Sequence, residues 1–364
     1  MAQNVRFSFR RFLFHNKTII LLTVLIVAIL LLLRSQAKST QTYYRNRAKT
    51  FNQLQLPYSK AELDDYYKLL LGIPSTNSTT NTNVQCENVW MIAAIPGFDI
   101  EDYVWEYVSL TAVNEIYGEN DGRKLNTYLS QRSIEDLERI FERIRFNDLG
   151  SVPSQCYRLH EAILVENGNS FYFNSNSQTK SMFLLADGER RYKEIAQVYG
   201  RKFQQSFRLN DLYKNVASLE ITSSKADLEK STGTPSADDA PIIGMYIRTL
   251  ELPSSYYERA MDFMRKIHYG SIFLIICPPH LIEECRDRFY GQDTVVKAQQ
   301  QLLELELAVM AMCDHMVIEN EFGILATLLN ENIGDVIVYV QMDEEIEWFS
   351  KYMTENFDNW YSIA

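Results

Sequence analysis

The segment PIIGMYIRTLELPSSYYERAM, which runs from Pro241 to Met261, decides the fold that we expect for this chain. Its apolar start predicts a buried strand over 242–247, and this strand ends by presenting Arg248 in a loop before a helix. Further along, residues 303–340 read LELELAVMAMCDHMVIENEFGILATLLNENIGDVIVYV, which predicts helix, short strand, turn, helix and strand. Alternating strands and helices predict a mainly parallel sheet, and such sheets bind anions and nucleotides where their strands end.

The C-terminal part of the chain is therefore predicted to be one α/β domain over 241–364. Ser255 and Glu258 give the spacing of a capping box, which marks the start of its first helix. We expect strands at 242–247, 271–276, 315–318 and 335–340, and helices at 255–267, 281–289, 296–312, 322–329 and 345–357.

A second α/β domain is expected upstream, over 88–221. The run VWMIAAI at 89–95 predicts a buried strand, and apolar residues at helical spacing predict a helix from about Asp99. Asp99, Glu101 and Asp102 suit the first turn of that helix, because carboxylates interact favourably with the helix dipole there. The same carboxylates would repel a phosphate group, so we interpret this turn as a capped helix start.

The boundary between the two domains is predicted from composition. Residues 222–240 are polar and rich in Ser, Thr and Asp, which is typical of a linker. Before it, the segment 133–144 predicts an amphipathic helix, with Ser133 and Asp136 in a pattern like a capping box.

The N-terminus predicts a membrane anchor. Residues 1–17 are basic, and 18–33 form an uncharged apolar run of about 24 Å as a helix, slightly short of the ~27 Å core of an early secretory membrane. We expect a signal-anchor, with a cleaved signal peptide as the alternative. Residues 34–87 are expected to form a stem with a short helix over 61–71. Flanking charge does not decide the orientation, but the small tail and the glycosylation sequon at Asn77 favour a lumenal body.

Composition excludes some classes of function. The chain has 364 residues and a net charge of −11, which argues against a nucleic-acid partner because phosphate binding needs clustered Lys and Arg. None of the five cysteines forms a C-x-x-C pair, so the common zinc patterns are absent. One or two disulfides are possible, with at least one thiol left over, and the sequence leaves their pairing open.

Arg248 is the strongest candidate for a functional residue. A guanidinium group at the end of a strand suits a diphosphate, whereas the structural alternative is a surface or ion-pair arginine. Glu251 lies in the same loop and either orients Arg248 or accepts a proton. His315 falls where a helix gives way to a strand and is interpreted as either a core hydrogen-bonding residue or a site residue. The sequence contains no D-x-D motif, so metal-dependent sugar transfer is not predicted.

Four short segments resemble blocks of the α-1,2-fucosyltransferase family, glycosyltransferase family 11. Residues 246–251 (YIRTLE) are similar to its H-V-R-R-G-D strand-loop, with the first arginine kept as Arg248 and a carboxylate kept as Glu251. The histidine, second arginine, glycine and aspartate of that motif are replaced. Three further blocks are matched with substitutions, the first only loosely, by residues 100–108, 306–315 and 321–338.

The resemblance implies a GT-B-like fold of two Rossmann-like domains and a Golgi type II membrane protein. The implied reaction is inverting, metal-independent transfer of fucose from GDP-fucose to a galactoside glycan. Arg248 and Glu251 would be catalytic, and the donor-binding residues would be Arg248, His315, Phe322 and Gly323.

The alternative is a catalytically inactive relative that binds glycans or a partner protein in the lumen. The replaced motif residues favour it, and so does the charge of 241–364, which holds 8 Lys and Arg against 20 Asp and Glu. Each charge-assisted bond lost to a phosphate would cost about 1.5–3 kcal/mol, or one to two decades of affinity.

Overall fold

The structure is a computed structural model, and all of its described residues belong to one compact unit, Ser59–Ala364. It describes residues 60–71, 73, 90–120, 123–153, 156, 159, 162–165, 182–186, 190–233, 239–300, 302–339 and 344–363. The predicted tail, anchor, Asn77 sequon and most of the stem lie outside them and stay predictions. In the described part of the chain, no helix is both long and apolar enough to cross a membrane. The expected stem helix is confirmed as α2, Lys60–Leu70.

The first sheet is built around the buried strand β1, Trp90–Ala94, which confirms the strand expected at 89–95. Its order is β2-β3-β1-β6-β5, with β4 beside β3. Strands β1, β3, β4, β5 and β6 pair in parallel, and β2 pairs antiparallel with β3. The other strands are β2 Glu119–Asn120, β3 Arg123–Leu129, β4 Asn147–Asp148, β5 Ile163–Val165 and β6 Met182–Leu185.

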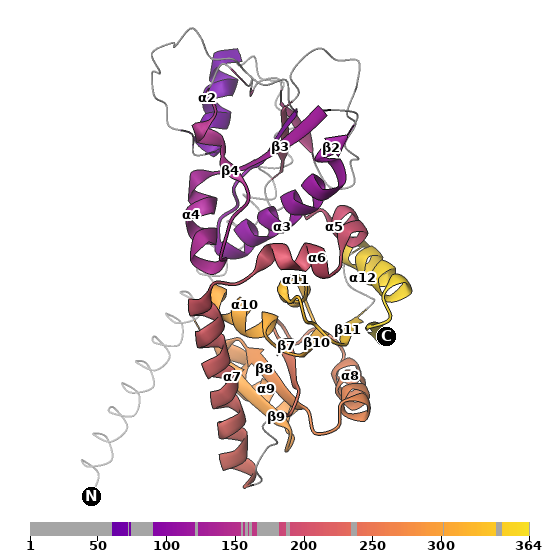
Figure 1. Cartoon of the computed structure of the whole chain (residues 1–364). Coiled ribbons are helices and arrows are strands. Elements are labelled where there is room, and N and C mark those ends of the chain that lie inside the picture. The colour runs from indigo at the N-terminus through magenta and orange to yellow at the C-terminus, as the bar shows by residue number, and fades with distance from the viewer. Residues whose placement is uncertain are drawn as a thin grey trace, which may run out of the picture. The chain divides into compact units, whose positions relative to one another are not determined.

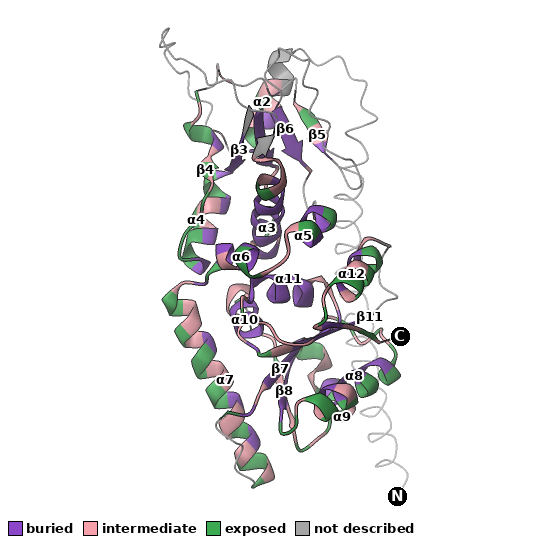
Figure 2. Ribbon diagram, turned by 45° about the vertical axis from the view of Figure 1, so that its right-hand side comes forward, coloured by how far each residue is buried: buried purple, intermediate pink, exposed green. Residues whose placement is uncertain are grey.

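Helix α3, Ile100–Tyr117, follows β1 and is buried on nearly all sides (Figure 2). The Asp99 side chain caps it by accepting hydrogen bonds from the backbone N–H groups of Glu101 and Asp102, at 2.9 and 3.1 Å. The next helix, α4, spans Gln131–Ile140, so it begins and ends before the predicted 133–144. It begins earlier because Ser130, and not Ser133, is its N-cap residue.

The second sheet is parallel throughout its described strands, in the order β12-β11-β10-β7-β8-β9. Read from β9, this is the 3-2-1-4-5-6 order of a doubly wound nucleotide-binding fold. The strand order reverses between β7 and β10, which are parallel neighbours. The strands are β7 Ile242–Tyr246, β8 Ile272–Cys277, β9 Thr294–Ala298, β10 His315–Ile318, β11 Val336–Tyr339 and β12 Trp360–Ile363.

Most helices of the second half confirm the expected segments. The exception is the predicted helix at 296–312, which is wrong in its first part: this part belongs to strand β9, and the helix begins only at Leu303. β9 forms because pairing with β8 satisfies its backbone and partly buries its valines. The helices are α8 Ser254–Ile267, α9 Ile282–Arg288, α10 Leu303–Ala311, α11 Glu321–Leu329 and α12 Glu344–Asn356.

The polar stretch predicted as a linker is largely helical. Helix α7, Asp211–Thr232, includes its first half and packs against α10 and β9 (Figure 1). Its inner face carries Ala217, Ser224 and Leu228, which are buried. Two of these three residues are small and one is polar, so hydrophobic periodicity did not reveal the helix.

The two sheets are joined by helices and by buried hydrogen bonds. Helix α3 contacts α10, and α5, Tyr192–Val198, contacts α12. Gln204, in the short helix α6 (Arg201–Gln204), donates to the carbonyls of Thr327 and Asn330, at 3.3 and 2.6 Å. These bonds tie the segment that follows the first sheet to the end of α11.

The structure also settles part of the cysteine pairing that the sequence left open. Cys277, at the end of β8, forms a disulfide with Cys285 in α9. Cys313 is a buried free thiol, and burial raises its pKa above the usual range.

Gly244, in the middle of β7, packs closely against Met316 in β10 and against Cys313, which follows α10. A Cβ atom there would lie 2.7 Å from Met316 Sδ and 2.9 Å from Cys313 Sγ. We therefore expect Gly244→Ala to lower the free energy of unfolding by about 1–3 kcal/mol, measured by urea denaturation. Gly323→Ala is the matched control, because its Cβ would meet nothing closer than 3.4 Å and alanine favours a helix. A Gly244→Ala protein as stable as the parent would contradict this packing.

Candidate functional site

Arg248 lies just beyond the carboxyl end of β7, at the point where the strand order of the second sheet reverses. It follows β7, and its backbone N–H donates to Oε2 of Glu319, which directly follows the neighbouring β10, at 3.2 Å. The Asn320 amide donates to the carbonyl of Tyr246 at 2.9 Å, and the Asn320 side-chain oxygen caps α11 by accepting the N–H of Gly323 at 3.2 Å. The loops after the two strands are thus bonded to each other, which fixes the backbone of Arg248 at the carboxyl edge of the sheet.

An aromatic side chain positions the guanidinium group of Arg248. Tyr246 and Phe322 stack with ring centroids 4.0 Å apart, and the Arg248 guanidinium carbon lies 5.8 Å from the Phe322 centroid. The hydroxyl of Tyr246 donates to Oε2 of Glu306 at 2.7 Å. The structure therefore places Phe322 against the guanidinium group of Arg248, and Gly323 is the next residue of the same helix. That these residues bind a donor stays a prediction.

The side-chain partner of Arg248 comes from helix α3, which follows the central strand β1 of the first sheet. Its guanidinium group forms an ion pair with Glu101, in the first turn of α3 just after β1. The Glu101 side chain is only 7% exposed. Burial raises the pKa of Glu101, and Arg248 offsets part of that rise. Sequence reasoning treated Glu101 only as a first-turn carboxylate and missed this role.

A second ion pair connects the carboxyl edges of the two sheets. In this pair the arginine comes from the first sheet's side and the glutamate from the second sheet's side. Arg190 follows β6 in the first sheet, and its two terminal nitrogens contact the carboxylate of Glu321, the first residue of α11, at 2.7 and 2.9 Å. The Arg190 guanidinium carbon lies 5.4 Å from the ring centroid of Trp105. Each sheet thus contributes one arginine and one glutamate to the two pairs, which we call the crossed ion pairs.

Carboxylates outnumber cations around Arg248. Glu306 and Glu319 are both buried, and burial raises the pKa of each, although hydrogen bonds to their carboxylates lower it in part. With Glu101 and Glu321, four glutamates lie at this edge of the two sheets, and two of them, Glu101 and Glu321, form ion pairs with the arginine side chains. An anionic ligand therefore has to displace carboxylates from these arginines in order to bind.

The structure does not bring the other two predicted site residues to this cluster. Glu251 is exposed in the loop beyond Arg248, and Glu319 is the carboxylate that holds the backbone of that loop. His315 pairs in register with Ile243, near the start of β7, whereas Arg248 follows its end. His315 and Arg248 therefore lie at opposite edges of the second sheet.

At that opposite edge, His315 stacks on His268 with ring centroids 3.6 Å apart. Its Nδ1 accepts the backbone N–H of Asp335 at 2.9 Å, and Nε2 of His268 lies 2.7 Å from the Asp335 carboxylate. These three side chains are of the kinds that bind metal ions, and their ligand atoms lie within 4.8 Å of one another. Stacked rings do not direct two lone pairs at one ion, so a metal would require one imidazole to turn.

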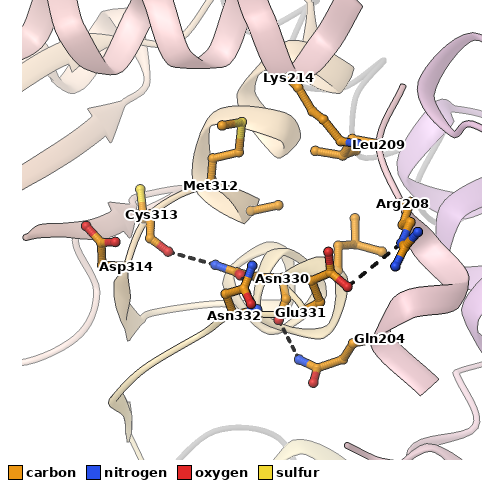
Figure 3. Close-up of a pocket in the computed structure, with 12 residues that line it drawn as sticks. Gln204, Arg208, Leu209, Lys214, Met312, Cys313, Asp314, Asn330, Glu331 and Asn332 are labelled. Carbon is orange, nitrogen blue, oxygen red and sulfur yellow. Dashed lines mark hydrogen bonds and ion pairs between the residues drawn. The ribbon is translucent and has the colours of Figure 1, made fainter. Parts of the chain in front are cut away.

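A cavity of about 300 Å³ also lies away from Arg248 (Figure 3). It opens between the start of α7 and the residues that precede β10 and β11. Its polar groups largely bond one another: Asn330 donates to the carbonyl of Cys313 at 2.7 Å, and Arg208 lies 3.9 Å from Glu331.

Fold and site together define an α/β protein with two largely parallel sheets whose carboxyl edges meet through the crossed ion pairs. No protein-family model matches the chain, and no curated protein matches its sequence.

Solved structures give weak similarities. A glycosyl transferase family 9 protein from Veillonella parvula is 7% identical, covers 70% of this chain and 81% of its own, and has a TM-score of 0.32. POFUT1 in complex with GDP is 9% identical, covers 69% of this chain and 97% of its own, and has a TM-score of 0.40. ADP-heptose LPS heptosyltransferase II from E. coli is 11% identical, with 69% and 84% covered and a TM-score of 0.32. At TM-scores below 0.5 these similarities carry no argument about activity.

The histidine stack predicts a pH-dependent stability. Burial lowers the pKa of His315, and the adjacent His268 lowers it further, against opposing effects of Asp335 and Asp314. The unfolded chain therefore binds this proton more readily, so the stabilising contribution is fully present above the ordinary pKa of about 6.5 and is lost as the pH falls from that value through the lower pKa of the folded state. We expect His315→Asn to reduce the loss of unfolding free energy between about pH 8 and pH 5.5, measured by urea denaturation.

His280→Asn is the control for this experiment, since His280 is exposed and should leave the pH dependence of the parent unchanged. If His315→Asn loses as much stability on acidification as the parent, the stack is not the pH-sensitive element.

Proposed function

We propose that this chain is a glycosyltransferase of the GT-B type that binds a nucleoside-diphosphate sugar at Arg248. The observation that carries the proposal is the place of Arg248: it follows the first strand of a 3-2-1-4-5-6 sheet, at the reversal point, and it faces Glu101 at the carboxyl edge of a second parallel sheet. Ligands of doubly wound sheets bind at such points.

The two members of the pair have complementary roles in glycosyl transfer. Arg248 would donate hydrogen bonds to the diphosphate and stabilise the charge that develops on it as it leaves. Once the diphosphate has taken its place on Arg248, Glu101 would accept the proton of the acceptor hydroxyl. That oxygen forms a bond to the anomeric carbon while the bond from this carbon to the diphosphate breaks. A buried carboxylate with a raised pKa is suited to this role as general base.

The finer assignment rests on the resemblance to the α-1,2-fucosyltransferases. It favours GDP-fucose as the donor and a galactose-containing glycan as the acceptor, with no metal required. A type II Golgi membrane protein, with its anchor at 18–33 and a glycan on Asn77, belongs to the same proposal.

A specific observation favours a second candidate, an inactive relative that binds a glycan or a partner protein. Arg248 is already neutralised by Glu101, and two further carboxyl groups lie close by: Glu319 accepts the backbone N–H of Arg248, and Glu306 accepts the hydroxyl of Tyr246. A diphosphate is repelled by that charge unless the carboxylates are displaced or protonated.

Binding of GDP to the full-length chain, measured by calorimetry, tests the proposal. We expect Arg248→Ala to weaken GDP at least about tenfold, because it removes a charge-assisted hydrogen bond to phosphate. Arg286→Ala is the control, since Arg286 is exposed on α9 and pairs with the exposed Glu283. A folded parent protein that binds no GDP at millimolar concentration would exclude the donor site, and an unchanged affinity in Arg248→Ala would remove Arg248 from it.

Turnover tests the role of Glu101. With GDP-fucose and a galactoside acceptor, Glu101→Gln should lower kcat by about 10²–10⁴-fold, as expected for loss of a general base. Its affinity for GDP should be equal to that of the parent or higher, because a competing carboxylate has been neutralised. A parent protein that binds GDP without transferring sugar would favour the inactive relative, and a Glu101→Gln protein with normal kcat would refute the assignment of the base.

A further inference from the structure

The crossed ion pairs contain a cation that the sequence motif did not reveal. Residues 246–251 match a family motif that has two arginines, and only Arg248 is kept. The structure places Arg190, from the first sheet, on Glu321 at the start of α11. Phe322, the next residue, lies against the guanidinium group of Arg248. Both arginines therefore border the first turn of the same helix, one from each sheet.

We infer that Arg190 and Arg248 together bind the diphosphate of the ligand, one arginine from each sheet, and that Glu101 and Glu321 occupy the two phosphate positions when no ligand is bound. This inference rests on the proposed function and names the residues that select a nucleoside diphosphate over a monophosphate.

Geometry supports the exchange at Arg190. A bidentate contact through two terminal nitrogens suits a phosphate as well as a carboxylate, so the guanidinium group that now holds Glu321 already has the arrangement a phosphate needs. A diphosphate carries enough charge to replace both carboxylates at once. Glu321 has a route out of the site, because its side chain is 24% exposed.

Buried hydrogen-bonding groups without partners at the same place support a ligand site. Among the described residues, Nε of Arg190, Oε1 of Glu101 and Nε1 of Trp105 are buried and have no hydrogen-bond partner. Trp105 lies under the guanidinium group of Arg190. Buried polar atoms without partners are costly, and a ligand that presents both acceptor and donor atoms would satisfy them.

Charge accounts for the need for a second arginine. Glu101 pairs with the side chain of Arg248, Glu319 accepts its backbone N–H, and the C-terminal half of the chain is strongly acidic. An arginine supplied by the other sheet restores the second positive charge without changing the strand-loop motif. It also makes binding depend on both sheets, so the diphosphate would hold the two carboxyl edges together in place of the crossed ion pairs.

Calorimetry with GDP and GMP on the full-length chain tests the inference. Arg190→Ala should weaken GDP about tenfold to a hundredfold, the expected effect of one lost phosphate contact, and should weaken GMP by less than about threefold. The ratio of the two affinities is the decisive quantity, since a structural defect would weaken both ligands alike. Arg201→Ala, at an exposed position of α6, is the control and should change neither affinity.

A second variant protects the test against misfolding of Arg190→Ala. Glu321→Gln keeps the shape of the side chain and removes its charge, so it should tighten GDP at least about threefold if Glu321 competes with phosphate. An unchanged or weaker GDP affinity in Glu321→Gln, or an equal loss of GDP and GMP affinity in Arg190→Ala, overturns the inference.

The outcomes also separate this inference from the proposed function. If the parent protein binds no GDP, the proposed function fails. If GDP binds and depends on Arg248 but not on Arg190, the proposed function stands and the second cation is wrong.

Discussion

The contact between Glu101 and Arg248 is the interaction on which the arrangement of the two sheets depends. A carboxylate that is almost fully buried is costly unless a cation compensates it. Here the carboxylate belongs to the helix after β1 and the cation to the loop after β7, so each charge is compensated only while the two carboxyl edges are in contact. The second pair, Arg190 with Glu321, repeats this dependence with the charges exchanged between the sheets.

The same contact explains why two functions, an active glycosyltransferase and an inactive binding protein, are both compatible with the site. Arginines held by carboxylates have the positions and geometry that a diphosphate requires, yet they are neutralised until an anion replaces those carboxylates. The surrounding glutamates raise the cost of that replacement. In this scheme the free energy of ligand binding is the difference between two sets of ion pairs, one within the protein and one with the phosphates.

Much of the fold was predictable because local signals agreed with the tertiary structure. The strand at β1, the cap at Asp99, the strand at β7 and the helix at α11 follow from periodicity and turn residues. Helix α7 and strand β9 were missed for physical reasons: α7 buries a small and partly polar face, and β9 is a strand because β8 lies beside it. His315 was grouped with Arg248 by motif, although sheet register places it at the other edge.

The sequence by itself determined most strands and helices of the second half, and that Arg248 follows a buried strand, because these properties depend on neighbours a few residues away. Only the tertiary structure decided what Arg248 contacts. Glu101 is 147 positions away from Arg248, and Arg190 is 131 positions away from Glu321, so no local pattern links them. They meet because two parallel sheets each end their central strands at one edge, and because burial of a charge there requires an opposite charge from the other sheet.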